Sequence, residues 1–396
     1  MAQHVGSIET TANPAAEGWL LLAAYETTGG NRDVSFVRYE PTTDTRTTLW
    51  TADNKVDFFG VRWGVSPDGR QIAYWSTMRD RSGQGGHRSV LIARHLTSQG
   101  ERRVLGTTSN PLAALLAQPF WSNNPASVWY LVPTLDDSRV RSGGELHRIV
   151  VRDLAEPPQV GDDRLVTTFS ATDLGLIQLA AINGSAQRLV LIAMEPENAS
   201  GTRHRAKELL LLDMTDWQVL LRLEIDTLPN WVTASTGGRH VAVTEYGTGN
   251  ASPRTRILDV ALGTVREILP EAGEIPAGPP LWSWDGDWVS WATRKGWRVA
   301  RLDSEAHESY ALPKPKGKTV TRLQPSNRGE AVGHELVAVA PGRPTLLLRA
   351  GIVGLASPRG AQAQRYFLHD LKQDTVQVLE QLPADRPLLI AWLPTD

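Results

Sequence analysis

The stretch that decides the fold is Ser66-Pro67-Asp68-Gly69-Arg70-Gln71-Ile72-Ala73-Tyr74-Trp75, a turn followed directly by an apolar strand. Asp-Gly supplies the positive φ angle that a tight hairpin requires, and the run after it has the length of a strand. Looser copies of this turn and strand recur at 122–130, 183–191, 235–243, 283–291 and 340–348. A turn-and-strand unit that recurs along the chain predicts a repeat protein built from hairpins.

A second recurring pattern is an apolar strand that ends in an acidic residue and a turn. Its acidic positions are Glu40, Asp153, Asp213, Asp259, Asp303 and Asp370, and His95 occupies the same place in a seventh copy. Together the two patterns give four strands per repeat, here named A to D in order. We predict that the aspartates cap turns. Four-stranded units at this spacing favour the blades of a β-propeller over a solenoid or a sandwich.

The two ends of the chain carry complementary incomplete repeats. Residues 18–52 supply strands B, C and D without a strand A, whereas 387–396 read as a strand A with nothing after it. We therefore predict that 388–391 pairs with 19–24, which removes an open sheet edge. The predicted fold is all-β: a seven-bladed β-propeller of four-stranded antiparallel blades, closed by a C-terminal strand that joins the N-terminal blade. Residues 1–17 are predicted to be a flexible arm, and 18–396 a single domain.

Tryptophans recur just before the turns between strands A and B. We predict that they pack between neighbouring blades and have no role in binding a ligand; they are Trp63, Trp121, Trp282 and Trp392.

The repeat at 66–74, with the following stretch 76–83, resembles the repeat of the TolB-like (WD-repeat-like) bacterial β-propeller family. The resemblance covers about residues 18–396 and is strongest in this one repeat. It implies a bacterial propeller of the cell envelope that binds proteins or small ligands at one face. The separate α/β domain that precedes the propeller in TolB is not visible in this sequence.

Composition sets further bounds. Apolar residues make up 41% of the 396 residues and the net charge is -2, which excludes a mainly disordered chain and disfavours a nucleic-acid binder. No apolar run is long enough to span a membrane. The chain has no cysteine, so disulfides, thiolate metal sites and cysteine nucleophiles are excluded. The polar residues 1–17 fit a linker behind a removed signal or anchor, which predicts a periplasmic or extracellular location; a cytoplasmic location is the alternative.

No catalytic constellation emerges from the sequence. A Gly-x-Ser-x-Gly elbow is absent, and Gly333-His334-Glu335 begins like a metallopeptidase motif but has Ala338 where a second histidine is needed. The predicted inner strands offer few metal ligands. We expect no catalytic residue, no metal and no cofactor, and the alternative is an enzyme of lactonase or lyase type that holds a small ligand at the channel mouth.

The loops between strands B and C carry a charge that differs from the rest of the chain. Over 26–33, 78–89, 136–144, 197–207, 246–256, 293–296 and 351–364 it sums to +8, against -2 for the whole chain. In a propeller these loops emerge on one face, so we predict a basic face that binds a protein or an anionic partner. An anionic polysaccharide or nucleic-acid ligand is a further alternative, and arginines kept for solubility would also explain the charge. The candidate residues are Arg79, Arg81, Arg88, Arg139, Arg141, Arg203, Arg205, Arg254 and Arg256.

Overall fold

The structure is a computed structural model of the chain. It describes residues 18–28, 31–52, 63–79, 87–97, 102–108, 117–123, 126–135, 141–151, 163–170, 176–196, 204–225, 230–247, 253–269, 276, 278–293, 296–303, 307–311, 334–342, 345–356, 362–373, 375–379, 382 and 388–394. The predicted arm, residues 1–17, lies outside this range. The chain divides into two compact units: unit 1 comprises 1–51 and 281–396, and unit 2 comprises 52–280.

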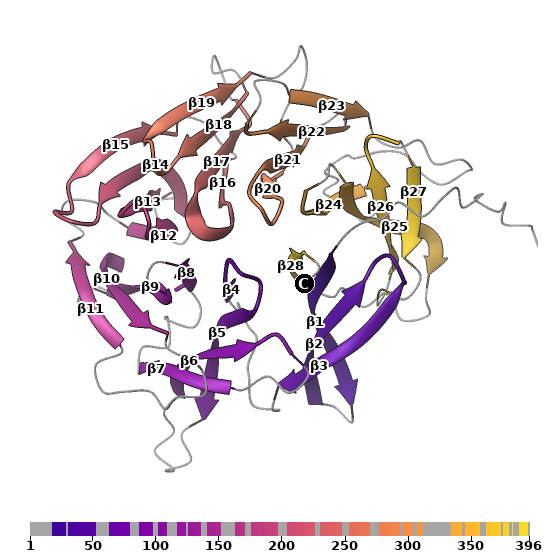
Figure 1. The fold of residues 1–396 in the computed structure, drawn as a ribbon, viewed down its shortest axis with the longest axis horizontal. Helices are drawn as coiled ribbons and strands as arrows, with labels where there is room; N and C mark the ends of the chain where they lie inside the picture. Colours follow the sequence, from indigo (N-terminus) through magenta and orange to yellow (C-terminus); the bar gives the residue numbers. More distant parts are fainter. Residues whose placement is uncertain are drawn as a thin grey trace, which may run out of the picture. The chain divides into compact units, whose positions relative to one another are not determined.

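Unit 2 contains four antiparallel four-stranded sheets, and in each sheet the strands lie side by side in chain order (Figure 1). The first two are β4 (Trp63–Val65), β5 (Gln71–Arg79), β6 (His87–His95), β7 (Arg102–Thr108), and β8 (Phe120–Asn123), β9 (Ala126–Leu135), β10 (Arg141–Val150), β11 (Asp163–Phe169). The other two are β12 (Leu176–Asn183), β13 (Arg188–Pro196), β14 (His204–Asp213), β15 (Val219–Glu224), and β16 (Asn230–Ala234), β17 (His240–Glu245), β18 (Arg254–Asp259), β19 (Thr264–Ile268).

Unit 1 contains three further sheets of the same kind. Two follow chain order: β20 (Leu281–Trp282), β21 (Trp288–Ala292), β22 (Gly296–Arg301), β23 (His307–Ala311), and β24 (His334–Val339), β25 (Thr345–Ala356), β26 (Gln362–Asp370), β27 (Thr375–Leu379). The third sheet has the order β28-β1-β2-β3 and combines β1 (Trp19–Thr28), β2 (Asn31–Glu40) and β3 (Thr45–Ala52) with β28 (Leu388–Leu393).

These seven four-stranded antiparallel sheets make the fold a seven-bladed β-propeller, as predicted. Within the described residues, helical structure is limited to one 3₁₀ turn, η1 (Thr236–Gly238). In unit 2 the first strands of successive sheets contact one another, β4 with β8, β8 with β12 and β12 with β16. The fourth strands β7, β11, β15 and β19 lie at the opposite, open edges of their sheets (Figure 1). A side chain on a fourth strand is therefore the one most accessible to another molecule.

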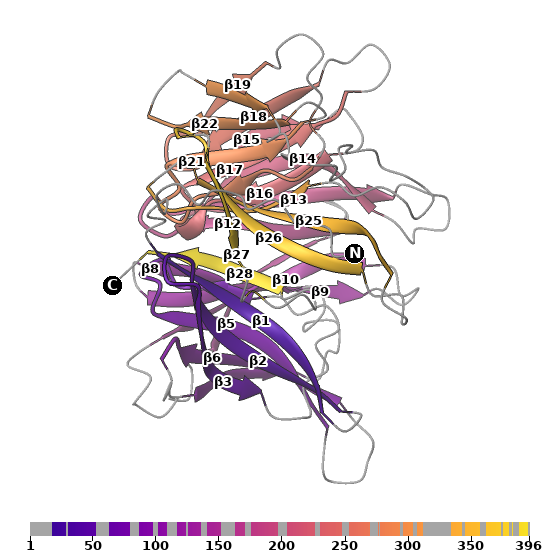
Figure 2. The same cartoon turned by 90° about the vertical axis from the view of Figure 1, so that its right-hand side faces the viewer.

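The predicted pairing of the two chain ends is confirmed. Strand β28 runs antiparallel to β1, with Trp19 opposite Leu393, Leu20 opposite Trp392 and Leu21 opposite Ala391. The two strands lie side by side in both views (Figure 1, Figure 2). A residue with a side chain would not fit at Gly18, because a Cβ there would lie 2.3 Å from the Leu393 carbonyl oxygen. The C-terminal strand thus supplies the missing strand A of the first sheet.

The turns between strands A and B share hydrogen bonds built on a buried serine. The Ser235 backbone N donates to the His240 carbonyl (2.9 Å), and the Ser235 Oγ accepts from the His240 backbone N (2.9 Å). The same two bonds form between Ser66 and Gln71 and between Ser283 and Trp288. A glycine with a φ of 71° to 73° completes each turn, at Gly69, Gly237 and Gly286. The motif recurs because each turn needs the hydroxyl and a residue that tolerates positive φ.

The turns after strand C are held by the predicted acidic caps. Oδ1 of Asp259 accepts from the backbone N of Ala261 and of Leu262, both at 2.9 Å. Asp213 caps Thr215 (2.8 Å), and Asp370 caps Lys372 (2.9 Å) and Gln373 (3.0 Å). The prediction is confirmed at these three turns, while Asp153 lies outside the described residues.

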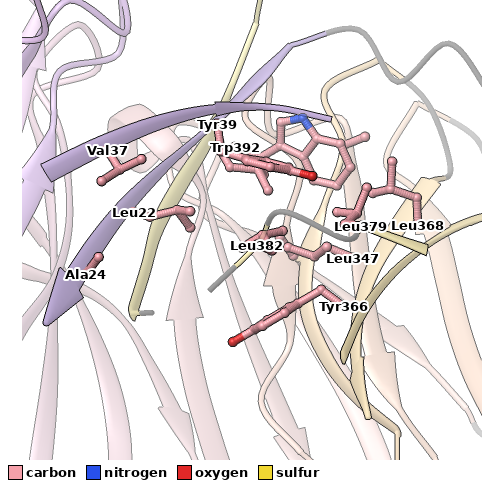
Figure 3. Close-up of a cluster of buried hydrophobic side chains, with 13 residues drawn as sticks. Leu22, Ala24, Val37, Tyr39, Leu347, Tyr366, Leu368, Leu379, Leu382 and Trp392 are labelled. Carbon is pink, nitrogen blue, oxygen red and sulfur yellow. The ribbon is translucent and has the colours of Figure 1, made fainter. Parts of the chain in front are cut away.

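Two of the four predicted tryptophans are buried between neighbouring sheets. Trp121 belongs to a cluster shared by the sheets of β4–β7 and β8–β11, and its Nε1 donates to the Gly64 carbonyl (2.8 Å). Trp392 is 3% exposed and packs among side chains of β1, β2, β25 and β26. Figure 3 shows it beside Tyr39, with Leu347 and Leu368 across from it. Trp63 and Trp282 are half-buried.

Candidate functional site

For six of the nine arginines of the predicted basic face the structure describes no side chain. Arg81, Arg139 and Arg203 lie outside the described residues. Arg79, Arg88 and Arg141 lie in strands β5, β6 and β10 near the B–C connections, and only their backbone is described. For these six residues the binding role stays a prediction. The other three candidates, Arg205, Arg254 and Arg256, have defined side-chain contacts.

Arg205 and Arg254 lie on strands, and each is bound to a glutamate of the adjacent strand. Arg205 Nε donates to Glu195 Oε1 at 2.6 Å, and both side chains are about one-third exposed (40% and 32%). Arg254 Nε lies 2.9 Å from Glu245 Oε2, directly across the β17–β18 hairpin. The positive charge counted for each of these arginines is therefore offset within its own hairpin.

The prediction that Arg256 belongs to an exposed binding loop is wrong. Strand β18 already begins at Arg254, so Arg256 lies inside the sheet and is only 6% exposed. Its Nη2 lies 2.7 Å from Oε2 of Glu245, which is 0% exposed, and also donates to the Glu224 carbonyl at the end of β15. Arg254, Arg256 and Glu245 thus form a buried ion-pair cluster that links two sheets. The spacing of Arg254 and Arg256 was the signal available in the sequence that the two arginines lie on one face of a strand, because residues two apart in a strand share a face.

A buried histidine lies at the other end of the same hairpin. His240 is 6% exposed, and its Nε2 is 3.7 Å from Oδ2 of Asp259, the residue that caps the β18–β19 turn. Burial lowers the pKa of His240 to about 4; the Asp259 charge opposes this shift, and Arg239 adds to it. His240 is therefore neutral in the folded protein at neutral pH.

We expect the stability of the protein to fall as the pH drops from about 6.5 to about 4. In this window the unfolded chain protonates His240 while the folded protein does not, so unfolding is favoured by up to about 3 kcal/mol. Urea unfolding at a series of pH values measures the slope. His240→Gln should flatten it, because the variant has no imidazole at this position to protonate. An equal slope in wild type and His240→Gln would contradict the assignment.

The sequence interpretation missed a set of exposed apolar side chains in unit 2. All large apolar residues that are exposed within the described residues lie on a fourth strand of unit 2 or in its flanking turns. This outer apolar set comprises Val104 (38% exposed), Leu165 (51%), Val219 (36%), Leu220 (48%), Leu262 (74%), Val265 (37%) and Leu269 (63%). It is densest along β19, where Leu262 lies in the turn before the strand, Val265 on it and Leu269 just after it. Single exposed leucines are ordinary, so it is the concentration on open sheet edges that makes this set a candidate interaction surface.

The described residues lack two further kinds of feature, a metal-binding cluster and a membrane-spanning helix. No group of three or more His, Asp or Glu side chains in this part of the chain could hold a metal ion. No helix in it is long and apolar enough to cross a membrane.

Comparison with known proteins assigns the chain to no family. No family model matches the chain, and no curated protein matches it. Similar solved structures include the β-propeller domain of the trilobed protease from Pyrococcus furiosus (8% identity, 82% of this chain and 83% of that chain, TM-score 0.42). TolB from Acinetobacter baumannii (11%, 95% and 81%, 0.38) and oligogalacturonate lyase from Vibrio parahaemolyticus (12%, 92% and 86%, 0.44) are also similar. Likeness at this level carries no argument about function, and membership of the TolB-like family stays a prediction.

Proposed function

We propose that this chain is a non-catalytic β-propeller scaffold that binds a protein partner. The observation that supports the proposal is the outer apolar set on the open edges of the unit 2 sheets. An open edge strand is normally protected by charged side chains, so leucine and valine at such edges favour coverage by another protein. We also propose that the basic connections between strands B and C contact the partner, now without Arg205, Arg254 and Arg256. The remaining candidates are Arg79, Arg81, Arg88, Arg139, Arg141 and Arg203. We further propose that the protein is located in the cell envelope of a bacterium. Cell fractionation with an antibody against the protein tests this location.

Chemical crosslinking with the tagged full chain in cells of its source tests the proposal. We expect the triple variant Leu262→Ser, Val265→Thr, Leu269→Ser to lose the crosslinked partner, because about 100 Å² or more of apolar contact would be removed. Its melting temperature should stay near that of the wild type, since these side chains are exposed. Thr264→Ser with Glu267→Gln, on the same strand, is the matched control and should retain the partner.

The same experiment separates the two surfaces. Reversal of Arg79, Arg81 and Arg88 to glutamate should weaken capture less than the apolar triple variant does. If only the arginine variant loses the partner, the basic connections carry the binding. Identical capture by all variants would refute the outer apolar set as a binding surface.

Two other measurements address the alternative functions. Turnover of a lactone or uronate substrate by the purified chain would favour the lactonase or lyase alternative. Binding of a polyanion that weakens steeply with salt would favour the polysaccharide or nucleic-acid alternative.

A further inference from the structure

One row of side chains crosses the whole sheet of β8–β11. Phe120 is directly opposite Trp129, Trp129 is opposite Arg148, and Arg148 is opposite Arg164. Directly opposite residues of antiparallel strands lie on the same face, with Cβ atoms about 5 Å apart. The row therefore runs from aromatic rings at the inner strands to two adjacent arginines, and the second of these, Arg164, lies on the free edge strand β11.

The two arginines occupy directly opposite positions on the neighbouring strands β10 and β11. The guanidinium carbon of Arg148 lies 5.3 Å from the centre of the Trp129 ring, which fixes the side chain, and its buried Nε has no hydrogen-bond partner. Arg164 is exposed. Within the part of the chain that the structure describes, no carboxylate forms an ion pair with either residue. Like charges directly opposite each other destabilise a sheet, so this pair costs stability that no carboxylate among the described residues offsets.

We propose that Arg148 and Arg164 form a binding site for a carboxylate of an acidic segment in a protein partner. Two arginines at directly opposite positions can offer several N–H donors to one carboxylate, and the guanidinium of one of them, Arg148, is already held over the Trp129 ring. Leu165, next to Arg164 on the edge strand, is 51% exposed and offers an apolar contact to the same partner. The inference rests on the proposed scaffold function and names the chemistry of the partner. It differs from the basic B–C connections, because Arg148 and Arg164 lie on the outer strands C and D.

Titration of the full chain with a synthetic peptide of six glutamates tests the site by calorimetry and by NMR of the tryptophan indoles. We expect the wild type to bind the peptide with an affinity that falls as salt is raised, and the Trp129 indole signal to shift. Arg148→Gln with Arg164→Gln should weaken binding by about tenfold or more, as expected for lost hydrogen bonds to a charged group. Arg222→Gln is the matched control: it removes an arginine from another outer strand that is already bound to Glu208 at 3.1 Å, and it should bind as the wild type does.

A stability measurement provides an independent readout. Arg164→Glu should raise the melting temperature, because it replaces a like-charge pair by an ion pair across the two strands, and it should abolish peptide binding. Unchanged peptide binding in the double variant, or equal loss in Arg222→Gln, would overturn the proposal. Inorganic phosphate that binds as tightly as the peptide would also overturn it, in favour of a free oxyanion site. Any of these failures leaves the crosslinking result at Leu262, Val265 and Leu269 standing, so the two proposals fail separately.

Discussion

Deletion of residues 387–396 is expected to leave the chain without a cooperatively folded structure at physiological temperature. The deletion removes β28, in which Trp392 is 3% exposed and Leu393 1% exposed. Truncation of one buried tryptophan costs about 3–5 kcal/mol and of one buried leucine about 2–5 kcal/mol, so their combined loss is comparable with the whole stability of a typical domain. The deletion also uncovers the edge of β1, whose residues Leu20 to Ala23 are almost fully buried, and aggregation should follow.

Circular dichroism and calorimetry measure this effect. The matched control is deletion of 394–396, which begins after the last residue of β28 and leaves all of its pairs with β1 intact. This shorter deletion should melt as the wild type does. A melting curve of the longer deletion that superimposes on the wild-type curve would contradict the closing role of β28.

Glu245→Ala is expected to destabilise the protein by about 3–5 kcal/mol. The substitution leaves Arg256, only 6% exposed, without the carboxylate that lies 2.7 Å from its Nη2. Removal of one partner from a buried ion pair has this cost because the remaining charge stays buried without compensation. Urea unfolding of the purified variant measures the change.

The β13–β14 hairpin offers a matched control for this prediction. Glu195 and Arg205 form an ion pair of the same residue types at the corresponding hairpin, but both are about one-third exposed (32% and 40%). Glu195→Ala should therefore cost about 0–1 kcal/mol. Simultaneous replacement of Glu245, Arg254 and Arg256 by leucine or methionine should recover much of the loss, since no charge then remains buried. Equal effects of Glu195→Ala and Glu245→Ala would show that burial does not govern the cost.

The fold was predictable from the sequence because its signals are local. The turn after Ser66 needs only a serine hydroxyl and the positive φ of Gly69, and both are visible in ten consecutive residues. The turn caps at Asp213, Asp259 and Asp370 bind backbone groups two or three residues away. The pairing of β28 with β1 also follows from the sequence, because the first repeat lacks a strand A and the C-terminal segment is a strand A without the rest of a repeat.

The site was predicted less well, because a net charge per loop does not say which charges are paired. The arginines at 254 and 256 were counted as loop residues, and the structure places both on β18 against Glu245. The outer apolar set was missed, because the sequence does not show which face of an outer strand is left uncovered.

The sequence by itself therefore determined the seven repeats, the turns that divide them and the strand that closes the first sheet. Only the tertiary structure decided that Arg256 is buried, that Arg148 lies opposite Arg164, and that the fourth strands of unit 2 expose apolar side chains. The physical reason is that these features depend on register between strands, and register is shifted by bulges such as the one between Leu146 and His147. A shift of one residue moves a side chain to the opposite face of its sheet, and the sequence alone does not show where such a shift occurs.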